Sequence, residues 1–167
     1  EDNTSRKILA ASRRAADGRS NVNGASPLPN WAEGTGIRNM APGTSMFDPV
    51  LCELVYRWFS PLGGLVLDPF AGGSVRGIMA SLLGRPYIGI ELREEQVMAN
   101  RQQESIAQNP LPQWIVGDSR DLPSMVGDVQ ADLIFTCPPY FDLERYSDDA
   151  RDLSNAVDYN AFMVDYR

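Results

Sequence analysis

Residues 65–74 read LVLDPFAGGS, and this stretch decides the fold that the sequence predicts. Its apolar start is typical of a buried strand, and residues 75–83 have the composition of a helix that follows the strand. Between them, Gly72 and Gly73 let the backbone approach a ligand closely, because no Cβ intervenes. The stretch therefore predicts a strand, a glycine loop and a helix, with Asp68 at the carboxyl end of the strand.

The same alternation of strand and helix continues along the chain. Further strands are expected over residues 87–90, 113–116 and 132–135, and a helix over residues 93–108. The alternation predicts an α/β fold of the Rossmann type, with three α/β/α layers and a mostly parallel sheet. Four strands are about half of a doubly wound sheet, so we expect an incomplete sheet. A missing carboxyl-terminal segment or a partner chain would complete it.

Composition divides the chain into two parts. Residues 1–45 are polar and rich in glycine, asparagine, serine and arginine, which predicts a flexible basic arm. Residues 46–167 form the predicted catalytic core, large enough to bury its own apolar side chains. The core begins with a helix that Asp48 caps and Pro49 starts. Another amphipathic helix is expected over residues 158–167.

Charge and composition exclude several classes of protein. The formal net charge of −7 is unfavourable for a free-standing nucleic-acid binder, since phosphate contacts supply most non-specific affinity. The sequence has no histidine, and Cys52 and Cys137 lack metal-ligand spacing, so a metal site is not expected. No apolar stretch approaches the roughly 20 residues that span a bilayer. No secretory signal is visible at the start of the sequence. We therefore expect a soluble, cytoplasmic protein.

Acidic residues close three of the four predicted strands. Asp68, Glu91 and Asp118 would meet at one edge of a parallel sheet, although any one of them also fits a solvated surface position. Glu91 follows Asp68 by 23 residues, close to the offset of about 20 at which a carboxylate holds ribose hydroxyls in nucleotide-binding sheets. The loop lacks the G-x-G-x-x-G pattern, and Asp68 would repel a pyrophosphate. A cationic or zwitterionic nucleoside such as S-adenosylmethionine fits these acids better than a dinucleotide.

Residues 136–140 read TCPPY and follow the apolar run that predicts the last strand. Pro138 and Pro139 stiffen this loop, since each fixes its own φ and lacks an amide hydrogen. The loop then holds its carbonyl oxygens in fixed directions beside the ring of Tyr140. We expect it to bind a planar substrate with an amino group, which donates to the carbonyls while the ring stacks on the plane. A structural Pro-Pro turn with a core tyrosine is the alternative that this motif alone leaves open.

Three motifs together resemble one family. Residues 68–73, DPFAGG, resemble the cofactor motif of the amino-methyltransferases that modify adenine N6 or cytosine N4 in DNA. Residues 136–140 resemble the catalytic motif of these enzymes, and residues 47–49, FDP, resemble the element that helps to hold the methionine end of the cofactor. The longer stretch over residues 45–152 also resembles methylases of bacteriophages and prophages, of the kind found in restriction–modification. Phage or prophage origin in a bacterial host is the implied setting.

The resemblance implies S-adenosylmethionine as the cofactor and duplex DNA, with one base swung out of the helix, as the substrate. Glu91 would hold the ribose hydroxyls, and Asp118 would accept from the adenine amino group of the cofactor. Tyr140 would stack on the extruded base. The residues that the resemblance assigns to the cofactor are Phe47, Asp48, Asp68, Pro69, Phe70, Gly72, Gly73, Glu91 and Asp118, and those it assigns to catalysis are Cys137, Pro138, Pro139 and Tyr140.

The chain departs from the family at the first position of the catalytic motif. Cys137 stands where Asp, Asn or Ser is usual, and a thiol is only a weak acceptor. If Cys137 takes no part, the Pro138 carbonyl is the main acceptor for the amine. Three alternatives stay open at this point: methylation of an RNA base or a protein amide, a non-catalytic cofactor-binding or DNA-docking fragment, and a nicotinamide-dependent oxidoreductase.

Overall fold

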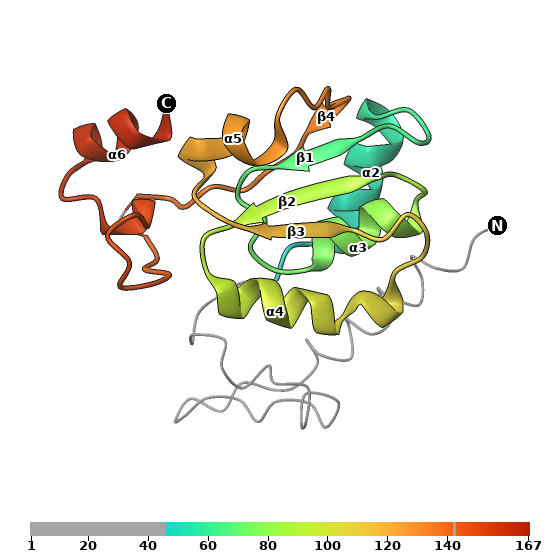
Figure 1. Ribbon diagram of the computed structural model, residues 1–167, viewed down its shortest axis with the longest axis horizontal. Helices are drawn as coiled ribbons and strands as arrows, with labels where there is room; N and C mark the ends of the chain where they lie inside the picture. Colours follow the sequence, from blue (N-terminus) through green and yellow to red (C-terminus); the bar gives the residue numbers. More distant parts are fainter. Residues whose placement is uncertain (1–45, 142) are drawn as a thin grey trace.

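The computed structural model describes residues 46–141 and 143–167. Four parallel strands form one sheet in the order β3-β2-β1-β4 (Figure 1). The strands are β1 (Val66–Asp68), β2 (Tyr87–Glu91), β3 (Gln113–Val116) and β4 (Leu133–Ile134). The predicted α/β fold with a parallel sheet is confirmed. The predicted arm over residues 1–45 lies outside the described residues.

Five α-helices accompany the sheet within the described residues. They are α2 (Pro49–Phe59), α3 (Val75–Leu82), α4 (Glu94–Gln102), α5 (Leu122–Val126) and α6 (Tyr159–Tyr166). The helix predicted over residues 93–108 is wrong in length, because α4 ends at Gln102 and a short 3₁₀ turn follows. Helix α5 is not predicted from the sequence, because its five residues are too few to show a helical period.

Helix α2 begins at the cap that the sequence predicts. Asp48 Oδ1 accepts from the amide of Val50 at 2.7 Å, and Pro49 occupies the first turn, where no intrahelical donor is needed. The helix buries Cys52 and Tyr56. Trp58 and Phe59, by contrast, are 70% and 64% exposed and lie outside the core. The buried stripe of α2 follows the i, i+4 spacing of Cys52 and Tyr56, which turns the last residues of the helix to solvent.

One face of the sheet and three helices share a single core. The strands contribute Val66, Tyr87 and Trp114, and α2, α3 and α4 cover them with the side chains of Tyr56, Met79 and Val97, among others. The connection from β3 back to β4 crosses the sheet in the direction opposite to that from β1 to β2. Because such crossovers are right-handed, this connection, which includes α5, runs on the side of the other face.

The carboxyl ends of the strands meet at one edge of the sheet. Asp68 pairs in register with Gly89, and Glu91 with Val116, so the residues that follow β1, β2 and β3 lie close together. Strand β1 has β2 as its neighbour on one side in the sheet and β4 as its neighbour on the other side. This is the topological switch point, where ligands of open α/β sheets bind. Helix α6 stands beside this edge (Figure 1) and stacks Tyr166 on Phe70.

Gly89→Ala is expected to destabilise the fold. A Cβ at this position would lie 2.8 Å from the Ala71 Cβ and 2.7 Å from the Tyr87 ring. Such overpacking costs about 1–3 kcal/mol of unfolding free energy, which urea denaturation would measure. The matched control is Gly73→Ala, where a Cβ would meet nothing within 4 Å and should change the stability by less than about 0.5 kcal/mol. Equal stabilities of both variants would contradict the packing described for β2.

Candidate functional site at the strand ends

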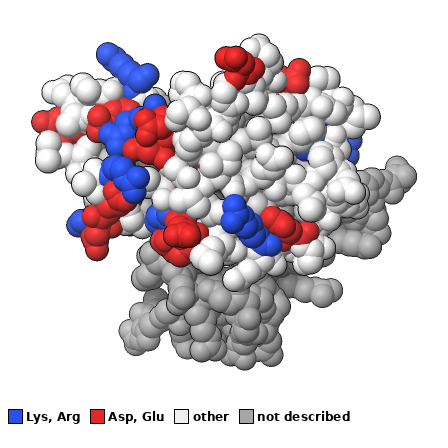
Figure 2. Space-filling model, in the orientation of Figure 1, with Lys and Arg blue, Asp and Glu red and all other residues white. Residues whose placement is uncertain are grey.

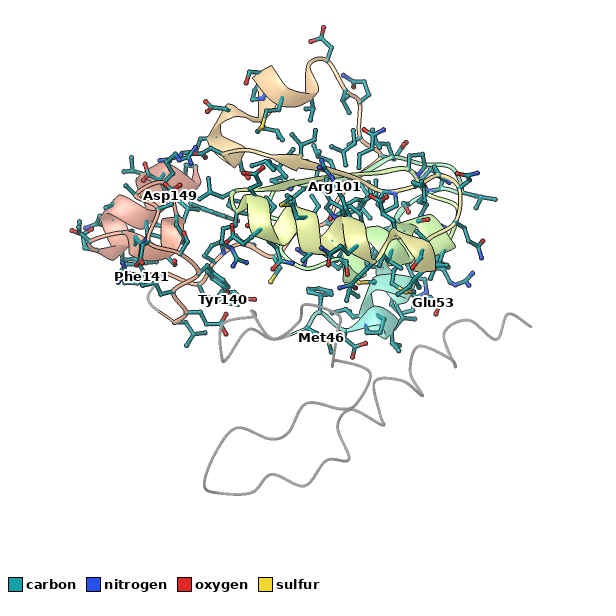
Figure 3. The ribbon with its side chains drawn as sticks, turned by 60° about the horizontal axis from the view of Figure 1, so that its bottom comes forward. Met46, Glu53, Arg101, Tyr140, Phe141 and Asp149 are labelled. Atoms are coloured by element: carbon teal, nitrogen blue, oxygen red, sulfur yellow. The ribbon has the colours of Figure 1, made fainter. Side chains whose placement is uncertain are left out.

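A cavity of about 450 Å³ lies at the carboxyl ends of the strands. Its walls come from the segment before α2, the glycine loop, the end of β2, the turn after β3 and the TCPPY loop. Figure 3 shows Met46 and Tyr140, which both line the cavity, on the same side of the molecule. The sequence-predicted residues that line it are Phe47, Pro69, Phe70, Gly72, Gly73, Glu91, Asp118, Cys137, Pro139 and Tyr140.

Three of the predicted site residues do not line this cavity. Asp48 caps α2. Asp68 is fully buried beneath the glycine loop. Pro138 lines a second cavity of about 410 Å³, which shares Pro139 and Tyr140 with the first. The other walls of this second cavity are the aromatic residues Phe141, Tyr159, Phe162 and Tyr166.

Hydrogen bonds hold every polar backbone group from Pro69 to Gly72. The amides of Phe70, Ala71 and Gly72 donate to Thr136 Oγ1, the Ile90 carbonyl and Glu91 Oε2, respectively. The carbonyls of the same segment accept from the side chains of Ser119, Arg76 and Asn100. Gly72 has a φ of +51°, a conformation that favours glycine, and a Cβ there would meet nothing within 4 Å. The loop is therefore fixed from below and open above.

A buried ion pair lies under the loop. Asp68 Oδ2 accepts from Arg76 Nε at 2.6 Å and from the Tyr87 hydroxyl at 2.7 Å. The side chains of Asp68 and Arg76 are 0% and 5% exposed. Burial raises the pKa of Tyr87, and the neighbouring Asp68 charge raises it further, so the phenol remains a donor. Asp68 thus fixes the polar groups that position the loop above it.

Glu91 lies at the end of β2 with its carboxylate in the cavity wall. Its Oε2 accepts from the amide of Gly72 at 2.9 Å, and its Oε1 accepts from the amide of Arg93 at 3.0 Å. Burial raises the pKa of Glu91, and these bonds from Arg93 and Gly72 offset part of the shift. Each carboxylate oxygen keeps a further lone pair, so Glu91 can still accept from the hydroxyls of a ligand.

Asp118, which follows β3, forms an ion pair with Arg120, two residues further along the chain. Both of its oxygens accept from Arg120, at distances from 2.7 to 3.1 Å. This contact lowers the pKa of Asp118 and keeps it ionised. Arg120 also forms an ion pair with Asp165 of α6 at 3.3 Å. Asp118 therefore lines the cavity as part of a charged link to α6, with its remaining lone pairs available to a donor.

The TCPPY loop is tied to the glycine loop. Thr136 Oγ1 accepts from the Phe70 amide at 3.0 Å, which fixes the distance between the two motifs. The Cys137 thiol and the Tyr140 hydroxyl lie 3.6 Å apart, and this contact raises the pKa of Tyr140. The ring of Tyr140 is 59% exposed. Phe141 follows with a φ of +36°, a strained conformation of the kind found at ligand sites.

Several residues of the site were missed by the sequence analysis. Arg76 is the only charged residue of α3, and a single arginine in an otherwise uncharged helix is a signal that points to a buried partner. Asn100 is fully buried in α4 and donates to the Gly72 carbonyl. Ser119 directly follows Asp118 and donates to the Pro69 carbonyl. No signal in the sequence distinguishes these last two from ordinary polar residues.

The described part of the chain holds neither a cluster of metal ligands nor a membrane-spanning helix. Over residues 46–141 and 143–167, no three or more His, Cys, Asp or Glu side chains are grouped as a metal would require. In the same part of the chain, no helix has both the length and the apolar character needed to cross a membrane.

The fold and the cavity at its strand ends define a Rossmann-like methyltransferase fold. The chain is similar to the crystal structure of TrmN from Thermus thermophilus, with a TM-score of 0.50 and 25% identity, over 70% of this chain and 34% of that chain. PH1948 of Pyrococcus horikoshii, described as an RNA methyltransferase, aligns over 63% of this chain and 50% of that chain, at 23% identity and a TM-score of 0.45.

The sequence also matches one family over part of its length. Residues 48–102 match the N6/N4 methyltransferase family, described as DNA methylase. YubD of Escherichia coli, which carries the name of a methylase, is 37% identical over 65 residues, 39% of this chain. The resemblance to the DNA amino-methyltransferases is thus confirmed over residues 48–102, which hold the glycine loop and Glu91 but not the TCPPY loop. The chain spans 29% of the length of YubD and 34% of that of TrmN.

Glu91→Gln is expected to change how stability depends on pH. Burial raises the pKa of Glu91 above its ordinary value of 4.5, so above pH 4.5 the folded protein keeps a proton that the unfolded chain releases. The unfolding free energy of the wild type therefore falls as the pH rises from 4.5 through the raised pKa, and glutamine removes this contribution. Urea denaturation at several pH values should show the variant gaining stability relative to the wild type as pH rises.

Glu95→Gln is the matched control for this experiment. Glu95 pairs with the same Arg93, at 3.8 Å, but its side chain is 74% exposed. Its substitution should leave the slope of stability against pH unchanged. A Glu91→Gln variant with the wild-type slope would contradict the burial described for Glu91.

Proposed function

We propose that this protein transfers a methyl group from S-adenosylmethionine to the exocyclic amino group of adenine (N6) or cytosine (N4) in DNA. One observation carries the proposal: the glycine loop and the TCPPY loop face the same cavity and are joined by the Phe70–Thr136 hydrogen bond. A cofactor loop and an amine-binding loop on one cavity are what direct transfer requires, because the donor and acceptor atoms must be held in line.

The residues of the cavity fit S-adenosylmethionine. The cofactor is a cation with ribose hydroxyls, an adenine and an amino-acid end, and it supplies an electrophilic methyl group on sulfur. Glu91 offers acceptors for the hydroxyls, and the open space above Gly72 accommodates a ligand without a clash. Phe47 and Phe70 give apolar walls to the cavity. A volume of about 450 Å³ is within the range of small-molecule sites.

The TCPPY loop supplies the acceptor side. An exocyclic amine is a poor nucleophile, because its lone pair is delocalised into the ring. Acceptors fixed at its two hydrogens, among them the Pro138 carbonyl, favour a pyramidal nitrogen whose lone pair points at the methyl group. This is positioning and electrostatic stabilisation, without a covalent intermediate. The aromatic second cavity, which shares Pro139 and Tyr140 with the first, supports a base stacked on Tyr140.

DNA as the substrate rests on the family match and the motif, and not on surface charge. On the face shown in Figure 2, basic and acidic side chains alternate, and no basic stripe separates from them. Phosphate contacts would then have to come from residues outside this face or from another chain. The same chemistry on an RNA base or a protein amide is the competing substrate class.

Nucleoside mass spectrometry tests the proposal. The protein is incubated with isotopically labelled S-adenosylmethionine and, separately, with unmethylated DNA, RNA and protein from one bacterial lysate. Labelled N6-methyladenine or N4-methylcytosine in the DNA is the expected result. If only RNA or only protein carried the label, that class would be the substrate and the proposal of DNA would be rejected. Cofactor binding by calorimetry with no transfer to any of the three would favour a non-catalytic fragment.

Tyr140→Ala is expected to lower kcat/KM for methyl transfer. Base–aromatic stacking contributes about 1–3 kcal/mol, so the loss should lie between about 5-fold and 150-fold. Trp58→Ala is the matched control, because Trp58 is an exposed aromatic residue that lines neither cavity. Its kcat/KM should stay at the wild-type value. Equal rates for both variants would reject stacking on Tyr140.

Cys137→Ser is expected to keep or raise the rate of transfer. Serine is a better hydrogen-bond acceptor than a thiol and has the same shape, so the contact with Tyr140 can persist. Single-turnover methylation, measured beside calorimetric binding of the cofactor, distinguishes the possible roles. If the variant binds the cofactor normally but transfers no methyl group, the thiol itself takes part in the chemistry.

A further inference from the structure

Arg76 is held rigidly in the wall of the cavity. Its Nε donates to Asp68 Oδ2 at 2.6 Å, and its Nη2 donates to the carbonyls of Phe70 at 2.6 Å and Ala71 at 3.0 Å. The ring of Phe47 lies over the guanidinium at 4.7 Å from its centroid. Contacts in the guanidinium plane and on its face leave the group almost no freedom to reorient.

The third guanidinium nitrogen of Arg76, Nη1, differs from Nε and Nη2 in its hydrogen bonding. Among the described residues, no acceptor receives a hydrogen bond from Nη1. The side chain is only 5% exposed, yet Arg76 is part of the cavity lining between Phe47 and Phe70. Nη1 is not among the described buried polar atoms that lack a partner, so it is open to the cavity that Arg76 lines. A fixed donor that faces a cavity is available to an acceptor on a ligand. An arginine fixed in this way favours an anionic oxygen.

The geometry points to Arg76 as the residue that recognises the carboxylate of the cofactor's amino-acid end. This inference rests on the proposed function and adds to it a specificity-determining residue. Asp68 neutralises the guanidinium, so the buried charge is stable before the ligand binds. The amino-acid end is a zwitterion and adds no net charge to the pair. Nη1 would thus gain an acceptor when the ligand enters, with little reorganisation.

Calorimetric binding of two ligands tests the inference. The first is S-adenosylhomocysteine, and the second is its decarboxylated analogue, the aminopropyl thioether of adenosine, which lacks only the carboxylate. The wild type should bind the first ligand about 10-fold to 100-fold more tightly, as expected for one charge-assisted hydrogen bond. Arg76→Lys keeps a cation beside Asp68 but removes the Nη1 donor, so most of this preference should disappear.

Arg85→Lys is the matched control. Arg85 is also buried, and it donates to Ser60 and to the Leu83 carbonyl, but it does not line the cavity. Its variant should keep the wild-type preference between the two ligands. If Arg76→Lys weakens both ligands by the same factor, Arg76 has only a structural role and the inference is rejected.

The wild type alone also decides the question, even if Arg76→Lys does not fold. Equal affinity of the wild type for the two ligands would overturn the role of Arg76 and leave the proposed function intact. Failure of the wild type to bind either ligand, or methylthioadenosine, would instead overturn the proposed cofactor and the inference with it.

Discussion

The buried ion pair between Asp68 and Arg76 is the interaction on which the site depends. Two opposite charges are removed from water, and a third group, the Tyr87 hydroxyl, completes the hydrogen bonds of the carboxylate. Removing one partner of such a pair costs about 3–5 kcal/mol, because the other charge is left uncompensated. The same guanidinium holds the carbonyls of Phe70 and Ala71. Stability of the core and shape of the cavity are thereby set by one contact.

The glycine loop differs physically from the loops that bind phosphates. Phosphate-binding loops present free amides to the anion, whereas the amides of Phe70, Ala71 and Gly72 are all used inside the protein. A pyrophosphate against this segment would also meet the carboxylate of Glu91. The structure therefore argues against a nicotinamide dinucleotide, an alternative that the sequence left open. A loop with satisfied amides suits a ligand recognised by its shape and by side chains.

The parts of the fold that the sequence predicts are those with local causes. The cap at Asp48, the glycine loop and the acidic strand ends each follow from residues that are adjacent in the chain. Pairings between distant residues have no local signal. The partners of Asp68 are an example, because Arg76 and Tyr87 become its neighbours only when α3 packs on the sheet. The sequence shows Asp68 at a strand end but not its buried partners, so it predicts a place in the cavity wall. In the structure Asp68 lies beneath that wall.

The two motifs are coupled through a bond that neither motif reveals alone. The amide of Phe70 is shared between Asp68 Oδ1, at 3.2 Å, and Thr136 Oγ1, at 3.0 Å. Thr136 directly follows β4, which pairs with β1, so the sheet itself brings the two loops within reach. A displacement of the TCPPY loop would therefore strain the glycine loop, and the reverse also holds. Under the proposed function the two loops hold the cofactor and the target base, whose alignment must be kept to within about 0.5 Å. A direct hydrogen bond between the loops is a physical means of maintaining that alignment.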